Sequence, residues 1–514
     1  MDLKTHLTLK PRWVIPVVGL LFFLYGCTGK KATAPVKSAS IVPLKTISAP
    51  VKNPLVVQLE TFLKDSALLH ASLSYCFLDA TNDSLIASCN AELSLVPAST
   101  MKLFITAAAL EILGPETRFR THLLYEGTIS NHTLHGNIII KGGGDPTFCM
   151  GEQTMKILFT NWSNAIKKLG IDSVDGSIIG DGRIFDSEYI PYTWTWGEIN
   201  MGYCAAASGL SVNGNIYQLF FEPFKEKRFA SDLKKVIPYI PEEAYYNRVV
   251  ETETDEEDIF LVGHPLTNRK TIMGIVNKEK KEVSIVAAIS NPPLAAATEF
   301  FNSLARNGVH ISGKAWSVTD SDSLMDRLKK ASPVHVTMVA SPTVAAIVHT
   351  TNQASYNFFA ENLLKHIGLN VSHHGGTEAG ALAVRRFWQS KGMDMGGFAM
   401  FDGSGISRFN TVTARQLIWL LSYMRTAHTS ADFLTSLSVA GVSGTLRTMC
   451  INSAAEGNVQ AKSGTMSRVK SYTGYAKTKT GRTVIFAIIV NNFEGPSAEI
   501  KQKIGQIMDA MARL

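Results

Sequence analysis

Charged residues are few in this chain of 514 amino acids, and no block of basic residues stands out. Asp, Glu, Lys and Arg make up 18% of the sequence, against 45% hydrophobic residues. This balance is typical of a globular protein and excludes global disorder or a collagen-like repeat. The formal net charge is only +7, and without a basic stripe we do not expect a nucleic acid as partner. At roughly 100 to 200 residues per domain, the length corresponds to roughly two to four structural units.

Cysteine is also scarce. The chain has six cysteines, and if Cys27 is set aside for the reason given below, the remaining number is odd and does not describe a complete disulfide framework. Cys76 and Cys89 lie symmetrically about a turn at Asn82-Asp83, so in a hairpin they could face each other across two strands. Export would permit oxidation of such a pair, but we favour two small buried hydrophobic side chains.

The hydrophobic run at the N-terminus is short. It comprises the 13 residues Val14 to Gly26 and follows Lys4, Lys10 and Arg12. A helix of this length is too short to span about 30 Å of hydrocarbon comfortably. We therefore interpret residues 1–26 as an export signal peptide.

The end of this signal, Leu24-Tyr25-Gly26-Cys27, resembles the bacterial lipobox, in which a small residue precedes a cysteine that is lipidated. Tyr25 is bulkier than that motif usually tolerates, so a plain cleaved signal and an uncleaved anchor remain alternatives. Residues 28–54 contain five Lys, four Pro and no acidic residue, a composition that cannot offset its ordering entropy by burial. We expect residues 27–54 to be a flexible tether to a membrane, whose lysines are solvated or favour anionic lipid head groups.

The rest of the chain predicts an α/β (α+β) fold with an insertion. Hydrophobic residues recur at helical or strand spacing near both ends. Near the N-terminal end we expect a helix over 55–63 and strands over 72–80 and 85–91. Near the C-terminal end we expect strands over 469–476 and 483–492 and a helix over 498–514. We therefore expect one antiparallel sheet flanked by helices, formed by residues 55–118 and 337–514.

Residues 119–336 have a different sequence pattern, with short β-branched runs separated by Gly, Asn and Asp. This pattern predicts inserted strand-rich domains. Within them, Glu251 to Asp258 holds six acidic residues in eight, which favours a solvated loop. We expect this loop to belong to a smaller nested unit near 216–265.

The first group with chemical potential is Ser99 and Lys102. The segment 97–102 begins an apolar helix that Gly114-Pro115 ends. Residues three apart lie on one face of a helix, so the Lys102 amine can lie beside the Ser99 hydroxyl. A serine needs a base to become nucleophilic, and a lysine serves only if its surroundings lower its pKa. Ser99 is the candidate nucleophile and Lys102 its base.

Two further motifs complete a set. Ser355-Tyr356-Asn357 precedes an expected helix, and Lys462-Ser463-Gly464-Thr465 leads into the C-terminal hairpin. They supply a hydroxyl with an amide, and a cation beside a glycine that allows a substrate backbone to approach a strand edge.

Each motif also occurs elsewhere in the chain. Ser231 and Ser467 begin two more Ser-x-x-Lys sequences, the first in the charged insert and the second in an expected strand. Ser211-Val212-Asn213 lies in the insert, and Lys479-Thr480-Gly481 forms a hairpin tip. Only Ser99 has an apolar helix behind it, so we take these four as chance matches.

The chosen set resembles the penicillin-interacting serine enzymes, which include D-Ala-D-Ala peptidases and β-lactamases. The segments that extend the resemblance are 97–110, 136–146, 210–215, 341–364, 402–408, 439–447 and 462–475. They are similar to the D-Ala-D-Ala carboxypeptidase/endopeptidase family of class C low-molecular-mass penicillin-binding proteins, over about 55–514. This family inserts two extra domains between the first two motifs, which fits the 253-residue gap from Lys102 to Ser355.

The resemblance implies a mechanism. Ser99 attacks the carbonyl between two D-alanines, Lys102 takes the hydroxyl proton, and the backbone N–H groups of Ser99 and Thr465 hold the oxyanion. Water then cleaves the acyl-enzyme. A β-lactam follows the same path, but its tethered leaving group blocks the water, so the enzyme stays acylated.

The same resemblance implies roles for the other motif residues. Ser355 relays a proton to the leaving D-Ala, and Asn357 bonds the substrate backbone or holds Lys102. Lys462 attracts the terminal carboxylate, and Ser463 and Gly464 line the substrate beside it.

Asp145, in a Gly-Gly-Gly-Asp-Pro segment, matches a family position that reaches towards the free amine of the peptide side chain. An Asp in this setting is also an ordinary turn former. Ser404 is expected to be structural, within a tight turn over 402–408. The glycines 142–144 lack the context of a dinucleotide loop, and His373-His374 lacks metal-ligand spacing, so we expect no cofactor and no metal.

The leading hypothesis is a penicillin-inhibited serine DD-carboxypeptidase with DD-endopeptidase activity. It would act on peptidoglycan stem peptides ending in D-Ala-D-Ala, on the periplasmic side of a bacterial envelope, and bind β-lactam antibiotics. A β-lactamase is the second hypothesis, disfavoured by the insertion. A catalytically weak cell-wall binding protein is the third, disfavoured by the intact motifs.

Overall fold

The computed structural model describes most of the chain beyond the expected tether. The described residues are 53–222, 232–238, 240, 244–254, 258–264, 267, 269–277, 279, 282–318 and 332–514. The predicted signal peptide, Cys27 and the tether up to Lys52 lie outside them. Among the described helices, none combines the length and the apolar composition needed to cross a bilayer.

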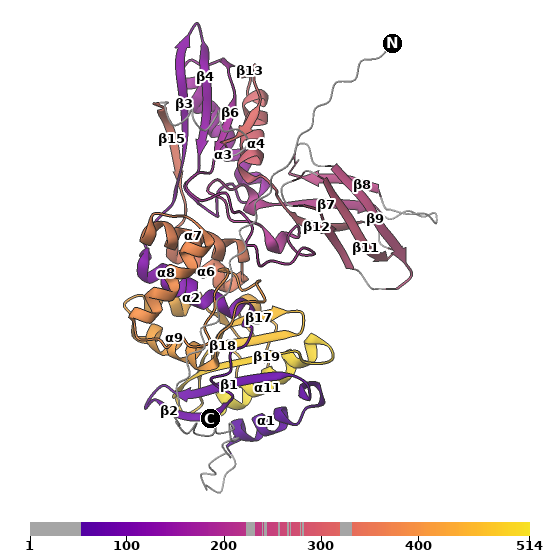
Figure 1. Cartoon of the computed structure of the whole chain (residues 1–514), viewed down its shortest axis with the longest axis vertical. Coiled ribbons are helices and arrows are strands. Elements are labelled where there is room, and N and C mark those ends of the chain that lie inside the picture. Colours follow the sequence, from indigo (N-terminus) through magenta and orange to yellow (C-terminus); the bar gives the residue numbers. More distant parts are fainter. Residues whose placement is uncertain are drawn as a thin grey trace, which may run out of the picture. The chain divides into compact units, whose positions relative to one another are not determined.

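A six-stranded antiparallel sheet, here called the main sheet, contains strands from both ends of the chain (Figure 1). Its strands in spatial order are β16 (Ser438–Val439), β17 (Val459–Met466), β18 (Val469–Lys477), β19 (Thr483–Asn491), β1 (Ser72–Asp79) and β2 (Ser84–Cys89). The register of β1 on β19 runs from Ser72 opposite Asn491 to Asp79 opposite Val484. The predicted antiparallel sheet with helical cover is confirmed.

Helices cover both faces of the main sheet because successive side chains of its central strands point to opposite faces. On one face, Phe486 and Ile488 of β19 pack with α1 and α11. On the other, Ile485 and Ile489 pack with a bundle of helices. The first pair is α1 (Pro54–Leu63) and α11 (Ser497–Ala512), and the bundle is α2 (Lys102–Ile112), α6 (Val344–Ala354), α7 (Asn357–Ser372), α8 (Thr377–Ser390), α9 (Ala414–Thr426) and α10 (Ser430–Ser436).

The register of the β1–β2 hairpin excludes a disulfide within it. Tyr75, not Cys76, lies opposite Cys89, and Cys76 lies opposite Ser88. A shift of one residue turns a side chain to the other face of a sheet. Cys76 therefore packs in the core beneath the helix bundle and Cys89 on the opposite face, and both are free thiols. The alternative of a bridge between them is wrong.

Strands are the main regular element in the described part of the insert between α2 and α6. One sheet follows the order β13-β5-β4-β3-β15, with β6 and β14 joined to it through β4. Its elements are β3 (Arg120–Ser130), β4 (Thr133–Lys141), β5 (Ser173–Asp175), β6 (Ile178–Asp181), β13 (His310–Ile311), β14 (Ala315–Ser317) and β15 (Val334–Ala340), with α3 (Glu152–Lys168) and α4 (Pro292–Arg306).

Two three-stranded sheets form the remainder of the insert, in the orders β12-β7-β8 and β10-β11-β9. Their strands are β7 (Ile216–Glu222), β8 (Asp232–Ile237), β9 (Ala244–Thr252), β10 (Asp258–Val262), β11 (Arg269–Asn277) and β12 (Val283–Ala288). They extend to Ala288, beyond the nested unit expected near 216–265, because β12 pairs with β7 from Val283 opposite Phe221 to Ala288 opposite Ile216. The acidic run connects β9 and β10, and its residues 255–257 are outside the described chain.

Candidate active site

Ser99 lies on a 3-10 turn, Ala98–Met101, and α2 begins only at Lys102. Ala98 has a φ of +48°, a left-handed conformation that a β-carbon disfavours. The Lys102 Nζ donates a hydrogen bond of 2.8 Å to Ser99 Oγ. The amine of Lys102, the predicted base, thus contacts the hydroxyl of Ser99, the predicted nucleophile.

Lys102 is fully buried and has two further partners. Its Nζ donates to Asn357 Oδ1 at 2.7 Å and to the Ser404 carbonyl oxygen. Burial lowers the pKa of Lys102 to about 7, although the carboxylates of Asp402 and Glu361 act in the opposite direction. A lysine with this pKa can be a neutral amine at neutral pH, as a general base requires.

The second motif is held at the junction of two helices. Ser355 ends α6 with a φ of +57°, and Asn357 begins α7. The Asn357 amide links two elements: its Oδ1 accepts from Lys102, and its Nδ2 donates to the Tyr203 carbonyl oxygen at 2.7 Å. Residues of the insert therefore fix the orientation of an active-site side chain.

The third motif lies on β17. Lys462 is fully buried, and its Nζ donates to Ser355 Oγ at 2.8 Å and to the Ser463 carbonyl oxygen at 2.7 Å. Burial, together with the charge of Lys102, lowers the pKa of Lys462 well below its usual range. Ser463 Oγ donates to Thr445 Oγ1 at 2.8 Å.

Gly464 brings this strand against the nucleophile. A β-carbon at Gly464 would lie 2.6 Å from the Pro97 carbonyl oxygen and 3.0 Å from the Ser99 nitrogen, so no side chain fits there. Thr465 follows directly and is exposed. The backbone N–H groups of Ser99 and Thr465 thus belong to neighbouring segments, as an oxyanion hole needs.

Two buried carboxylates, Asp402 and Glu361, raise the pKa of Lys102. The sequence placed Asp402 only in a tight turn, and Glu361 was not predicted to belong to the site. Asp402 accepts from the Gly405 and Ser407 amides at 2.8 and 2.6 Å, which holds the tight turn predicted over 402–408. Glu361 accepts from the Ser404 amide at 2.7 Å, so the Ser404 carbonyl oxygen, not its hydroxyl, meets Lys102. Burial and the charge of Asp402 raise the pKa of Glu361 above its usual range. The sequence signal for Glu361 was its position one helical turn after Asn357, which puts both residues on the same face of α7.

We expect the rate of acylation by a penicillin to rise with pH through a midpoint near pH 7 and to level off above it, because Lys102 with a pKa of about 7 must lose its proton to act as base. Stopped-flow acylation rates between pH 5 and 9 measure this midpoint. Replacing Glu361 by Gln removes a negative charge that raises the pKa of Lys102, so the midpoint should move lower. A wild-type midpoint near 10 would contradict the assignment.

The chance matches lie apart from this cluster. Ser467 is in the turn between β17 and β18, and Lys479 and Gly481 are in the turn between β18 and β19. The segment 211–213 leads into a 3-10 turn of the insert, and Ser231 is outside the described residues. Within the part of the chain that the structure describes, only the set that begins with Ser99 is assembled.

Asp145 also lies outside the cluster. Its side chain is 3% exposed and accepts from the Thr147 amide and hydroxyl at 2.8 and 2.7 Å, the geometry of a turn former. Another carboxylate, Glu198, is half-buried and accepts from the hydroxyls of Thr195 and Tyr203. The Tyr203 carbonyl oxygen accepts from Asn357.

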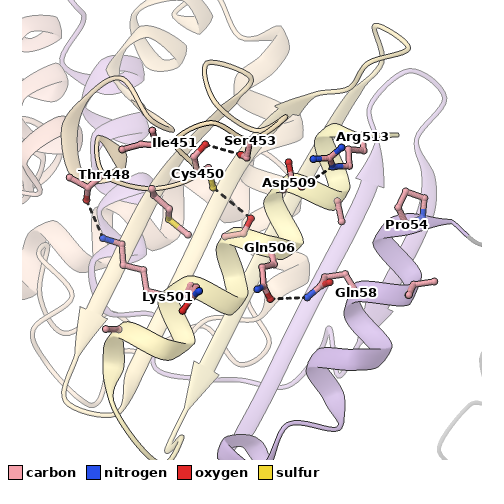
Figure 2. Close-up of a pocket in the computed structure, with 16 residues that line it drawn as sticks. Pro54, Gln58, Thr448, Cys450, Ile451, Ser453, Lys501, Gln506, Asp509 and Arg513 are labelled. Atoms are coloured by element: carbon pink, nitrogen blue, oxygen red, sulfur yellow. Dashed lines mark hydrogen bonds and ion pairs between the residues drawn. The ribbon is translucent and has the colours of Figure 1, made fainter.

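A cavity of about 960 Å³ opens between α1, α11 and residues 448–453 (Figure 2). It contains no residue of the three motifs, so it is not the site of the chemistry. Among the described residues, no group of three or more His, Cys, Asp and Glu side chains is placed to hold a metal ion.

Comparison with known proteins identifies the family of this arrangement. A sequence model of the D-Ala-D-Ala carboxypeptidase 3 (S13) family matches residues 55–514. The D-alanyl-D-alanine carboxypeptidase of Actinomadura sp. strain R39 is 29% identical over 461 residues, 85% of this chain and 81% of that protein. The D-alanyl-D-alanine carboxypeptidase DacB of Haemophilus influenzae is 23% identical over 440 residues, 84% and 88% of the two chains.

Solved structures show the same fold. The crystal structure of penicillin binding protein 4 (dacB) from Haemophilus influenzae has a TM-score of 0.75 at 22% identity, and covers 89% of this chain and 98% of its own. Its complex with a novel β-lactam has a TM-score of 0.70 at 21% identity, with coverage of 86% and 96%.

Proposed function

The chain belongs to the D-Ala-D-Ala carboxypeptidase 3 (S13) family and is a serine-type DD-peptidase, and we propose that Ser99 carries the reaction on peptidoglycan stem peptides. The supporting observation is the buried Lys102 amine, which contacts both Ser99 Oγ and Asn357 Oδ1. The products would be free D-Ala from stem peptides and separated strands from D-Ala cross-links.

Acylation begins when the neutral Lys102 amine takes the proton of the Ser99 hydroxyl as Oγ bonds to the carbonyl carbon. The N–H groups of Ser99 and Thr465 stabilise the tetrahedral oxyanion. The C–N bond then breaks, and the proton reaches the leaving amine through Ser355, whose hydroxyl lies 2.8 Å from Lys462 Nζ. D-Ala departs and an ester on Ser99 remains.

Deacylation reverses these roles with water as the nucleophile. Lys102 accepts the proton of the water, and Ser99 regains its own when the ester breaks. A β-lactam acylates Ser99 by the same step, but its leaving group stays attached and blocks the water. The protein should therefore bind penicillins covalently.

Substrate contacts follow from the surroundings of the motifs. The open edge of β17 at Gly464 receives the peptide backbone, beside Asn357 and Ser463. For the free amine of the peptide side chain, we assign Asp145, which lies in the Gly-Gly-Gly-Asp-Pro segment that resembles the family position.

Digestion of purified cross-linked peptidoglycan, followed by mass spectrometry, tests this function. We expect release of D-Ala from pentapeptides, conversion of cross-linked dimers to monomers, or both, with Ser99→Ala as the matched control. Absence of both products would contradict the proposal. Rapid turnover of a chromogenic cephalosporin would instead favour the β-lactamase hypothesis.

The location of the enzyme is a separate part of the proposal. The family fits the bacterial cell envelope on its periplasmic side, and Gly26-Cys27 after a short hydrophobic run supports a lipid anchor on Cys27. The lysine-rich tether would let the catalytic domain reach the wall above the membrane.

We expect the wild-type protein to fractionate with membranes and to incorporate radiolabelled palmitate, and Cys27→Ala to lose the label. More than one acyl chain on the cysteine should keep the protein attached in high salt, which releases proteins that are held by charge alone. Unlabelled and freely soluble wild-type protein would show that Tyr25 prevents lipidation.

A further inference from the structure

Lys470 lies beside the strand that carries the third motif. In the antiparallel pair of β17 and β18, Lys470 is directly opposite Thr465, so the two side chains lie on the same face of the main sheet. The Lys470 Nζ donates a hydrogen bond of 2.9 Å to Thr465 Oγ1. A second ammonium group therefore contacts Thr465, the residue that follows Gly464.

The position of Thr465 relates this contact to the binding of a peptide substrate. Gly464 lies against the Ser99 nitrogen, and β16 pairs with β17 only at Gln460 and Ala461. Among the described strands, none pairs with that edge of β17 from Lys462 onwards. The exposed Thr465 therefore borders the edge along which a peptide would bind.

Lys462 is poorly suited to attract a carboxylate alone. It is fully buried, and Ser355 and the Ser463 carbonyl oxygen already accept hydrogen bonds from its Nζ. Burial and the charge of Lys102 lower the pKa of Lys462, so its positive charge is costly in the free enzyme. A second cation at this edge would share the attraction of the terminal carboxylate of the substrate.

Lys470 carries a charge without a counter-ion in the described part of the chain, where its ammonium forms no ion pair. Its side chain is 7% exposed, and burial and the charge of Lys501 lower its pKa. Lys501 extends from α11 towards Thr448 on the same side of the sheet (Figure 2). An unpaired cation in such surroundings is unfavourable until an anion approaches.

We propose that Lys470, held by Thr465, is a specificity-determining residue that attracts the C-terminal carboxylate of the peptide at the edge of β17. This inference rests on the proposed function. The alternative is a structural role in which Lys470 only orients Thr465.

Two substrates that differ only in their C-terminal group distinguish carboxylate binding by Lys470 from a structural role. We expect Lys470→Met to lower kcat/KM for an acyl-D-Ala-D-Ala peptide with a free carboxylate about tenfold, mostly through KM, because the charge-assisted contact is lost. The C-terminal amide of the same peptide should change less than about twofold. Lys470→Arg should restore most of the activity on the acid, and Lys479→Met, which removes a lysine at the other end of β18, should leave both rates unchanged.

An equal loss on acid and amide would overturn the proposal, since a structural role affects both substrates. Both rates are measured on one preparation, so a partly unfolded variant does not change their ratio, and Lys470→Gln provides the same comparison if Lys470→Met does not fold.

If the proposed function itself is wrong, the wild type cleaves neither the acid nor the amide peptide. If it is still acylated at Ser99, the acylation rates with benzylpenicillin and its methyl ester replace the two peptides, and Lys470→Met should slow only the acid. If the wild type reacts with none of these compounds, the proposed function and this inference are both wrong.

Discussion

Ser99→Ala is expected to abolish covalent labelling by penicillin and to reduce peptide cleavage by about a thousandfold or more, because no other group can form the acyl bond. Ser99 Oγ is the hydroxyl that lies 2.8 Å from the buried Lys102 amine. The measurement is labelling with a tagged penicillin, followed by peptide mapping of the wild-type adduct. The variant should fold normally, since only one hydroxyl is lost.

The other candidate serines provide matched controls for this result. Ser467→Ala and Ser404→Ala should both keep covalent labelling on Ser99, since Ser467 belongs to a turn and Ser404 contributes its carbonyl oxygen to the site. Mapping of the adduct to either of these serines would contradict the choice of nucleophile.

The second large effect is expected at Lys462. Lys462→Ala removes the side chain that joins Ser355 Oγ to β17. We expect the acylation rate to fall by about two orders of magnitude or more. Rapid-mixing measurement of penicillin acylation, with circular dichroism to confirm folding, determines the loss.

Lys479 is the control, since Lys479-Thr480-Gly481 repeats the pattern of the third motif only 17 residues further along the chain. Lys479 lies in the turn after β18, away from Ser99. Lys479→Ala should change the acylation rate less than about twofold. A large loss at Lys479 with none at Lys462 would reverse the assignment of the two triplets.

Much of the site could be predicted because its signals are local. Ser99 and Lys102 lie three residues apart at a helix start, a spacing that brings their side chains together whatever the rest of the chain does. The apolar, β-branched run 483–492 similarly predicts a strand from composition alone. The choice between the triplets at Lys462 and Lys479 rested on the expected strand topology, in which the second triplet forms a hairpin tip.

Other parts of the site depend on contacts between distant segments. Lys102 meets Asn357 and the Ser404 carbonyl oxygen across 255 and 302 residues of sequence, and no periodicity encodes such a meeting. Glu361 reads in sequence as one more charged residue of a helix. Its burial against the turn at 402–408 exists only after the helices pack.

The sequence by itself determined the α/β fold, the two-part main sheet with its insertion, and the three motifs, because each depends on spacings within a helix turn or a strand. The tertiary structure alone decided two other points: that Cys76 and Cys89 face opposite sides of the main sheet, and that Lys470 donates a hydrogen bond to Thr465. These depend on strand register and burial, which are set by the packing of the whole chain. A change of one residue in register would reverse each strand's faces while leaving the local pattern unaltered.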